Sequence, residues 1–222
     1  MARLPRLVLA GQPHLLIQRA LDQQAIFLDE QDLARLIEVL RMGLADERVQ
    51  LHAYALRTHE IQLLATPAAP QSLARLMQTI GRRYVVAFNH RHGRSGTLWN
   101  GRFSAAAVEP GEPLLTAMSW VEQSGDTVEA TSAAHHLGHR RDPLITDPSA
   151  YWSLGNTPFA REAAWRDRLM GGIAEAQAAR LRRAARGGWA FGSPGFISAA
   201  GAHGRPAAPR APGRPPRHQP LI

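Results

Sequence analysis

The sequence predicts an α+β domain with a ferredoxin-like, split βαβ antiparallel sheet, followed by a helical C-terminal extension and a disordered tail. Two observations support this fold class. Two long segments carry apolar residues at helical spacing, and short apolar runs lie before, between and after them. Their order along the chain is β-α-β-β-α-β. In this pattern both helices cover one face of the sheet, and the other face is left for a ligand or another element.

The first half of the pattern comprises three strands and one helix. Residues 14–19 form a short apolar run that predicts a strand. Residues 29–45 predict a helix because one apolar stripe runs through Leu33, Leu36, Ile37, Leu40 and Leu44. Residues 49–56 and 61–66 then predict two strands joined by a tight turn at residues 57–60.

The second half begins at Ser72, which we expect to cap a long helix. Its stripe consists of Leu73, Leu76, Met77, Ile80, Tyr84 and Phe88. A glycine-bearing loop at 93–101, a strand at 103–108 and a helix at 113–121 follow. Beyond residue 123 we expect one helix, over 160–186. These elements divide the chain into a domain at 1–122, a helical extension at 123–200 and a Pro/Arg-rich tail at 201–222 that cannot bury a core.

Composition excludes several classes of protein. The chain has 222 residues, 45% of them hydrophobic, which favours a globular domain over wholesale disorder. It has no cysteine, so disulfides and thiolate zinc sites are excluded. The apolar run near the start is too short for a signal-peptide core, and no stretch approaches the roughly 18 apolar residues of a membrane span. We therefore expect a cytoplasmic protein without membrane contact.

Charge is distributed unevenly. All 26 basic residues are arginines, and the formal net charge is +8. The excess lies in the C-terminal part, because no acid follows Glu175. A second acid-free stretch covers residues 61–108 and contains Arg75, Arg82, Arg83, Arg91, Arg94 and Arg102. Arginine forks match phosphate oxygens, so this stretch predicts a nucleic-acid footprint. Codon bias combined with solvated helix faces would give the same pattern.

Several segments match the motifs of one family. The most specific is Gly-Arg-Ser-Gly-Thr-Leu-Trp-Asn-Gly-Arg-Phe at residues 93–103. Further matching segments lie at residues 5–19, 52–54, 63–67, 77–85, 141–144 and 188–193. On these residues the sequence resembles the REP-associated tyrosine transposases, which are single-tyrosine HUH enzymes. The resemblance spans most of the chain.

The resemblance implies a ferredoxin-like HUH domain that recognises a hairpin of single-stranded DNA. In active members two histidines on one strand hold a divalent cation, and residues i and i+2 of a strand do point to the same face. The metal polarises the scissile phosphate. A tyrosine on a later helix attacks it and leaves a phosphotyrosine link.

This sequence departs from the family at the catalytic positions. Glu60 and Gln62 stand where the two histidines are expected, and Trp120 stands in place of the tyrosine. Ser124 takes the position of a further polar residue, and the early Arg-Gly-Asn segment reads Arg19-Ala20-Leu21. Glutamate and glutamine offer oxygen ligands, so weak Mg²⁺ or Mn²⁺ binding stays open. Indole has only an N–H donor, so Trp120 cannot form the covalent link.

The sequence therefore favours a DNA-binding protein that recognises hairpin or single-stranded DNA without cleaving it. It leaves open whether the chain is an enzyme. The alternatives are a metal-dependent nuclease that uses Glu60 and Gln62 with another nucleophile, and a decayed transposase with only a partner-binding role. A homodimer is also left open. The candidate DNA contacts are Arg82, Arg83, Arg94, Arg102 and Trp99.

Other motifs have simpler interpretations. Trp99 could stack on bases or merely pack its loop against the sheet. His90-Arg91-His92 predicts surface histidines at a helix end, and His135, His136 and His139 predict loop polarity, because no fourth metal ligand is evident. Two Gly-Arg-Pro units, at 204–206 and 213–215, are similar to minor-groove hooks, but a disordered basic tail is the default interpretation.

Overall fold

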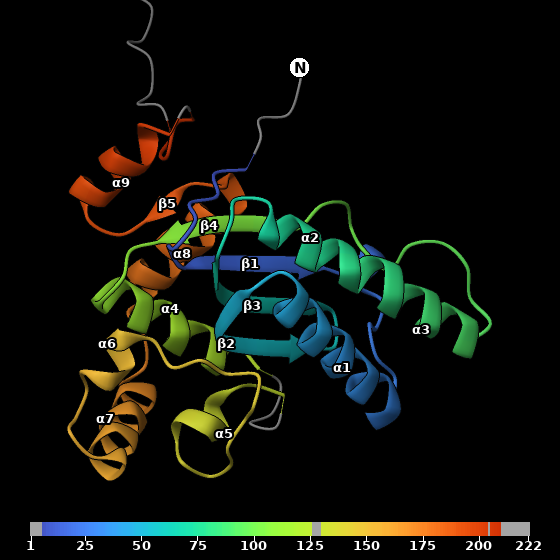
Figure 1. The fold of residues 1–222 in the computed structure, drawn as a ribbon, viewed down its shortest axis with the longest axis horizontal. Coiled ribbons are helices and arrows are strands. Elements are labelled where there is room, and N and C mark those ends of the chain that lie inside the picture. Colours follow the sequence, from blue (N-terminus) through green and yellow to red (C-terminus); the bar gives the residue numbers. More distant parts are fainter. Residues whose placement is uncertain (1–5, 126–129, 204, 210–222) are drawn as a thin grey trace, which may run out of the picture.

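The computed structural model describes residues 6–125, 130–203 and 205–209. A five-stranded sheet in the order β2-β3-β1-β4-β5 lies at its centre (Figure 1). The strands are β1 (His14–Arg19), β2 (Val49–Arg57), β3 (Glu60–Pro67), β4 (Ser104–Val108) and β5 (Ala190–Phe191). The first four strands are antiparallel to their neighbours in the order that a split βαβ fold requires, so the predicted fold class is confirmed.

The β2–β3 hairpin turns where the sequence predicts it. Arg57 pairs with Glu60, which leaves Thr58 and His59 as a two-residue turn. β1 lies between β3 and β4, with Ile17 opposite Gln62 on one side and Ser104 on the other. The fifth strand was not predicted. It pairs in parallel with β4 and brings the C-terminal part of the chain into the same sheet.

One face of the sheet is covered by the two helices that the apolar stripes predict. α1 (Glu30–Asp46) begins at Asp29, whose side chain accepts a hydrogen bond from the backbone N–H of Asp32. The second helix is continuous through α2 (Ser72–Thr79), a π-helical turn η2 (Ile80–Tyr84) and α3 (Val85–Arg91). All six apolar residues of its predicted stripe are buried.

Ser72 does not cap this helix, contrary to the prediction. The capping position is Gln71, whose side chain makes no capping hydrogen bond. Ser72 is itself buried at the first helical position, where its backbone N–H donates to the carbonyl of Ala69. The chain thus enters the helix through a backbone turn, which a cap motif in the sequence does not reveal.

The opposite face of the sheet is covered by the C-terminal half of the chain. α4 (Glu112–Gln123), α7 (Pro158–Gly171) and α8 (Glu175–Gly187) share one apolar cluster with that face, and Trp165 is completely buried in it. Two single-turn helices, α5 (Ala133–His136) and α6 (Ser149–Trp152), pack beside them (Figure 1). The face that the split βαβ pattern leaves open is therefore occupied by this chain's own helices.

The single helix expected over 160–186 is instead two helices. α7 ends at Gly171, and Gly172 has a φ of +68°, a conformation that glycine adopts without strain. α8 starts three residues later at Glu175. Two adjacent glycines in an otherwise helical pattern were the available signal for this break.

The C-terminal segment also differs from the prediction in part. α9 (Pro194–Gly201) follows β5, and the chain then returns to the sheet edge. There the backbone N–H of Ala190 donates to the carbonyl of Ala207 at 2.8 Å, and Ala207 is buried. The predicted tail therefore packs on the domain as far as this contact. Residues 210–222 lie outside the described residues.

No helix in the described part of the chain has the length and apolar character needed to cross a membrane.

Candidate functional site

The site that the sequence resemblance suggests lies between β3 and the end of α4. Glu60 and Gln62 point to the same face of the sheet, because they are two residues apart on β3. α4 crosses that face, and Ser124, which follows its last residue, donates its hydroxyl to Gln62 Oε1 at 2.7 Å. Hydrogen bonds thus link the two strand positions to the end of α4.

The polar groups of this site form a continuous hydrogen-bonded chain. Arg19, which lies opposite Glu60 in the β1–β3 pairing, donates through Nε to Glu60 Oε2 at 2.7 Å. Gln62 donates through Nε2 to Glu60 Oε1, also at 2.7 Å. These hydrogen bonds thus engage both carboxylate oxygens of Glu60 and the amide oxygen of Gln62. A divalent ion at these oxygens would compete with these donors, and displacement of a donor would leave it without its acceptor.

Burial makes that displacement costly. The side chain of Glu60 is 14% exposed, and Gln62 is only 1% exposed. A buried polar atom that loses its hydrogen-bond partner costs about 1–3 kcal/mol. The residues that could hold a metal here are therefore already satisfied within the protein.

Trp120 lies one helical turn before Ser124 on α4. It is half-buried and packs against the apolar cluster beneath α4. Its indole is therefore partly a core residue and partly open to solvent. It offers an N–H donor but no oxygen that could attack phosphorus.

An open cleft of about 650 Å³ adjoins the exposed side of Glu60. It lies where β1 ends and the β2–β3 hairpin turns, and it is lined by both Arg19 and Arg57. The loop at 93–101 borders it, because Asn100 donates its backbone N–H to the carbonyl of Arg19. The cleft thus lies between Glu60 and the loop at 93–101.

The five candidate DNA contacts do not form one patch. Arg82 and Arg83 are exposed on η2, and the indole of Trp99 lies about 4.0 Å from where a Cβ on Gly81 would be. Trp99 is half-buried against the first core cluster, so it packs its loop as well as offering an exposed edge. Arg94 hydrogen-bonds to Gln24 and stacks 5.4 Å from the ring of Phe88.

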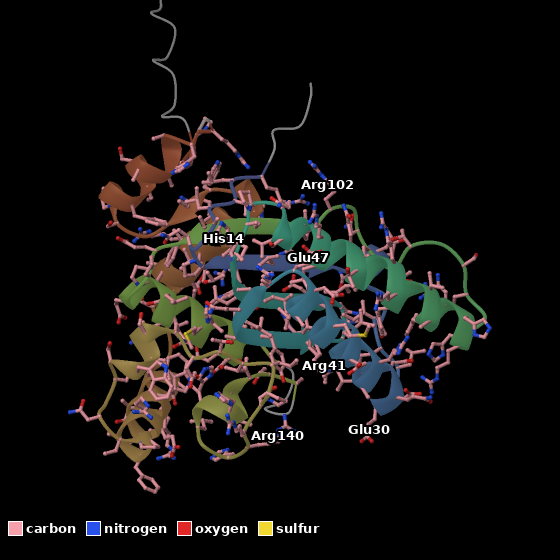
Figure 2. All side chains as sticks on the ribbon, viewed as in Figure 1. His14, Glu30, Arg41, Glu47, Arg102 and Arg140 are labelled. Carbon is pink, nitrogen blue, oxygen red and sulfur yellow. The ribbon has the colours of Figure 1, made fainter. Side chains whose placement is uncertain are left out.

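The fifth candidate, Arg102, lies two residues before β4. It is exposed and points away from the domain (Figure 2).

Two arginines of the acid-free stretch are neutralised from elsewhere in the fold. Arg91 forms ion pairs with Asp29 and Asp32, at 2.6 and 2.5 Å, and Arg75 lies 3.9 Å from Glu47. These acids come from α1 or its ends, so a linear count of charge could not reveal them. The histidine beside Arg91 also differs from the prediction: His92 is half-buried and contacts Asp32 at 2.8 Å.

A buried polar network links α4 to the C-terminal helices, and sequence reasoning missed it. The Glu122 carboxylate is completely buried and accepts hydrogen bonds from three side chains: Ser132 Oγ at 2.5 Å, His136 Nδ1 at 2.5 Å and Trp165 Nε1 at 2.8 Å. His136 is also fully buried, so its interpretation as loop polarity is wrong. Only His139 is exposed as that interpretation requires. The sequence did carry one sign of this network, because Glu122 is an acid within the apolar face of α4.

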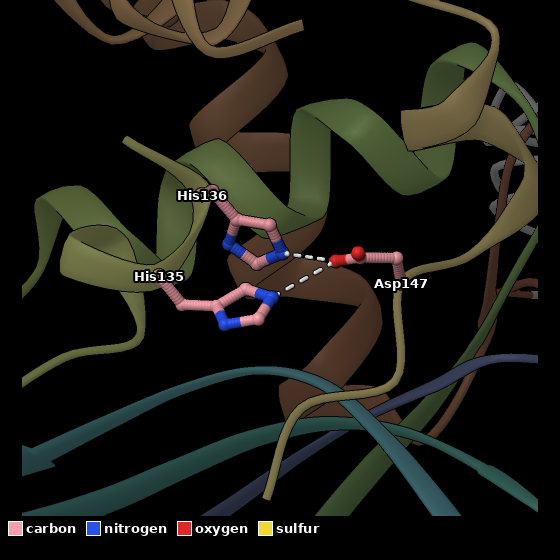
Figure 3. A group of neighbouring side chains, drawn as sticks. All are labelled: His135, His136 and Asp147. Atoms are coloured by element: carbon pink, nitrogen blue, oxygen red, sulfur yellow. Dashed lines mark hydrogen bonds and ion pairs between the residues drawn. The ribbon is translucent and has the colours of Figure 1, made fainter. Parts of the chain in front are cut away.

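The same network contains a group with metal-ligand geometry. His135 and His136 both point at Asp147 (Figure 3), and the three potential ligand atoms lie within 4.8 Å of one another. However, the backbone N–H of Asp142 donates to Nδ1 of His135 at 3.0 Å. The proton of that ring is therefore on Nε2, the atom facing Asp147, and leaves no lone pair there for a metal.

His136 is held as a cation between two carboxylates. Burial alone would lower its pKa, but Glu122 and Asp147 raise the pKa to about 9. Burial likewise opposes ionisation of Asp147, whereas His135 and His136 hold its pKa well below the usual range. We therefore interpret the group as an internal ion-pair network that fixes α4 against α5 and α7.

No protein-family model matches the sequence, and no curated protein matches it. Solved structures do match. The structure of a REP-associated tyrosine transposase bound to a REP hairpin has a TM-score of 0.50 at 12% identity, and the match covers 68% of this chain and 96% of that one. A candidate transposase from Deinococcus radiodurans R1 has a TM-score of 0.38 at 23% identity over 49% of this chain and 88% of its own, which is too distant to bear on the fold. The chain therefore has the fold of a REP-associated tyrosine transposase.

Proposed function

We propose that this protein binds hairpin or single-stranded DNA and does not cleave it. The observation that carries the binding proposal is the set of exposed arginines with no acidic partner among the described residues, Arg82, Arg83 and Arg102. Trp99 beside Gly81 adds an aromatic edge on which a base could stack. The similar structure that contains a REP hairpin supports DNA as the partner.

The proposal that cleavage is lost rests on the site between β3 and α4. Trp120 has no attacking oxygen. The acceptor oxygens of Glu60 and Gln62 are occupied by Arg19, Gln62 and Ser124. Neither the nucleophile nor an open metal position of the family mechanism is therefore in place, and we propose that DNA binding needs no metal cofactor. Affinity should then be the same in EDTA as in Mg²⁺ of equal ionic strength.

The binding proposal is tested by a salt titration with a hairpin oligonucleotide. For single strands, log affinity falls with log salt by about 0.7 for each neutralised phosphate. Arg82→Gln combined with Arg83→Gln should flatten the slope by about 1.4, which corresponds to two contacts. A matched control is Arg141→Gln with Arg166→Gln, two exposed arginines between α5 and α6 and on α7, which should leave the slope unchanged. If the wild-type protein binds no hairpin even at low salt, the proposal is wrong.

Location and assembly belong to the same proposal. The cysteine-free composition suits a reducing compartment, and we propose that the protein acts in the cytoplasm. Cell fractionation would test this. A homodimer is compatible with a hairpin ligand, and sedimentation with and without DNA would show whether one forms.

A further inference from the structure

A second basic cleft lies on the edge of the sheet, away from the site between β3 and α4. Its volume is about 260 Å³, and it opens between the start of β4 and the end of α8. Four arginines line it, and each comes from a different part of the chain: Arg6, Arg102, Arg186 and Arg205.

Two of these arginines are held in place by the fold. The guanidinium of Arg6 lies 3.6 Å over the ring of Phe103 and donates to the carbonyl of the same residue at 2.9 and 3.1 Å. Arg205 donates through Nη2 to the carbonyl of Gly187 at 3.0 Å. Burial lowers the pKa of Arg205, which shows that its charge has lost part of its hydration. Arg102 and Arg186 are exposed at the rim.

The backbone is shaped to admit Arg205. Gly188 ends α8 with a φ of +66°, and a Cβ at this position would lie 2.8 Å from Arg205 Nη2. A glycine at the helix end therefore both supplies the left-handed turn and leaves room for the guanidinium. The Gly-Arg-Pro unit that the sequence suggested as a groove hook instead contributes Arg205 to this cleft.

The guanidinium groups of the rim are available to a ligand. Among the described residues that line the cleft none is acidic. Arg102 and Arg186 are exposed and form no ion pair within the described part of the chain. Planar guanidinium forks match the oxygens of a phosphate group, so this pair offers donors to an anion in the cleft.

We propose that this cleft binds a backbone phosphate of the nucleic acid, as a second contact surface distinct from η2. The inference rests on the proposed DNA-binding function and deepens it, because it names a second set of phosphate contacts. Arg102 follows the loop at 93–101 in the chain and also lines the cleft. Arg6 and Arg205 form the floor, and Arg102 and Arg186 offer their guanidinium groups from the rim.

The test uses the full chain and changes only the exposed rim. Arg186→Gln, which changes the cleft alone, should reduce the salt slope of hairpin binding by about 0.7. Arg102→Gln with Arg186→Gln should reduce it by about 1.4 and weaken binding roughly tenfold or more near 0.1 M salt. The Arg141→Gln/Arg166→Gln variant carries the same loss of charge as the rim variant, outside the cleft, and should bind as wild type does. Circular dichroism of each variant should match the wild type, because Arg102 and Arg186 have no ion-pair partner among the described residues.

A second measurement separates this inference from the proposed function. Inorganic pyrophosphate should raise the melting temperature of the wild-type protein and of the control variant, but not that of the rim variant. Hairpin binding with an unchanged slope in Arg186→Gln would show that the cleft holds no phosphate and would leave the proposed function standing. Pyrophosphate stabilisation through the rim without any hairpin binding would overturn the function and keep an anion site. If neither ligand binds, both are wrong.

Discussion

At the scale of single residues, Trp120 determines what chemistry the site can perform. An indole in place of a phenol leaves no oxygen to attack the phosphorus. We therefore expect no covalent protein–DNA adduct with Mg²⁺ or Mn²⁺. Trp120→Tyr alone should not restore one, because Arg19 and Gln62 still occupy both oxygens of Glu60. Denaturing gel electrophoresis with labelled hairpin DNA measures this directly. A labelled band from the wild-type protein that survives denaturation would contradict the prediction.

Ser124 is a residue whose contribution to stability can be isolated. It donates to Gln62 Oε1, and Gln62 is 1% exposed. Ser124→Ala should therefore lower the free energy of unfolding by about 1–3 kcal/mol, the usual cost of an unsatisfied buried acceptor.

Ser153→Ala is the matched control for this variant. Ser153 also ends a helix and donates to a helix carbonyl, but it is exposed and makes no such cross-link. Urea denaturation of both variants gives the comparison. Equal losses of stability would show that the bond to Gln62 contributes nothing.

At the scale of helices and strands, the network around Glu122 should make the free energy of unfolding fall as the pH rises above neutrality. The pKa of His136 is about 9 in the folded protein, against about 6.5 for an unperturbed histidine. A pKa raised by folding stabilises the protein fully below about 6.5, and this contribution is lost as the pH rises towards 9. The wild-type protein should thus lose stability across this window.

The contribution of His136 is isolated by comparison of variants. His136→Gln should be less stable at pH 6 and should show a flatter profile between pH 6 and 9.5. His90→Gln removes an exposed histidine and should follow the wild-type profile. Urea midpoints at a series of pH values provide the measurement. Parallel profiles for wild type and His136→Gln would show that His136 is not the titrating group.

The helices and strands also show what local sequence pattern can predict. The two helices over the first face were predicted because their apolar stripes repeat over several turns, and the β2–β3 turn because the two strands flank it closely. β5 was not predicted, since two residues carry no periodicity and its strand character comes only from pairing with β4. The break between α7 and α8 depends on Gly172, a signal that the longer helical pattern outweighed.

For the whole molecule, local sequence pattern accounts for the geometry around β3 better than for the distribution of charge. The alignment of Glu60 and Gln62 on one strand follows from period-two geometry, and α4 does meet them. The acid-free stretch overestimated the number of unpaired arginines. Asp29, Asp32 and Glu47, from α1 or its ends, form ion pairs with Arg91 and Arg75. Such pairings join residues far apart in the chain and depend on tertiary packing, which no local pattern records.

The C-terminal segment provides the last prediction. A protein that ends at Pro209 should melt at the wild-type temperature, because the Pro/Arg-rich remainder has no apolar pattern with which to pack. A protein that ends at Ala200 should be less stable by about 1–3 kcal/mol. It loses buried Ala207, leaves the backbone N–H of Ala190 without its partner, and loses the contact from Arg205 to Gly187.

Calorimetry of the two truncated proteins beside the full chain tests this prediction. Hairpin titrations of the same proteins should show a separate effect on binding. The Pro209 protein lacks three arginines of the tail and should lose non-specific affinity while keeping its melting temperature. The Ala200 protein should lose both stability and the phosphate contact that Arg205 supports. Equal melting temperatures for all three proteins would show that the segment from Gly201 to Pro209 adds nothing to the fold, in conflict with the buried position of Ala207.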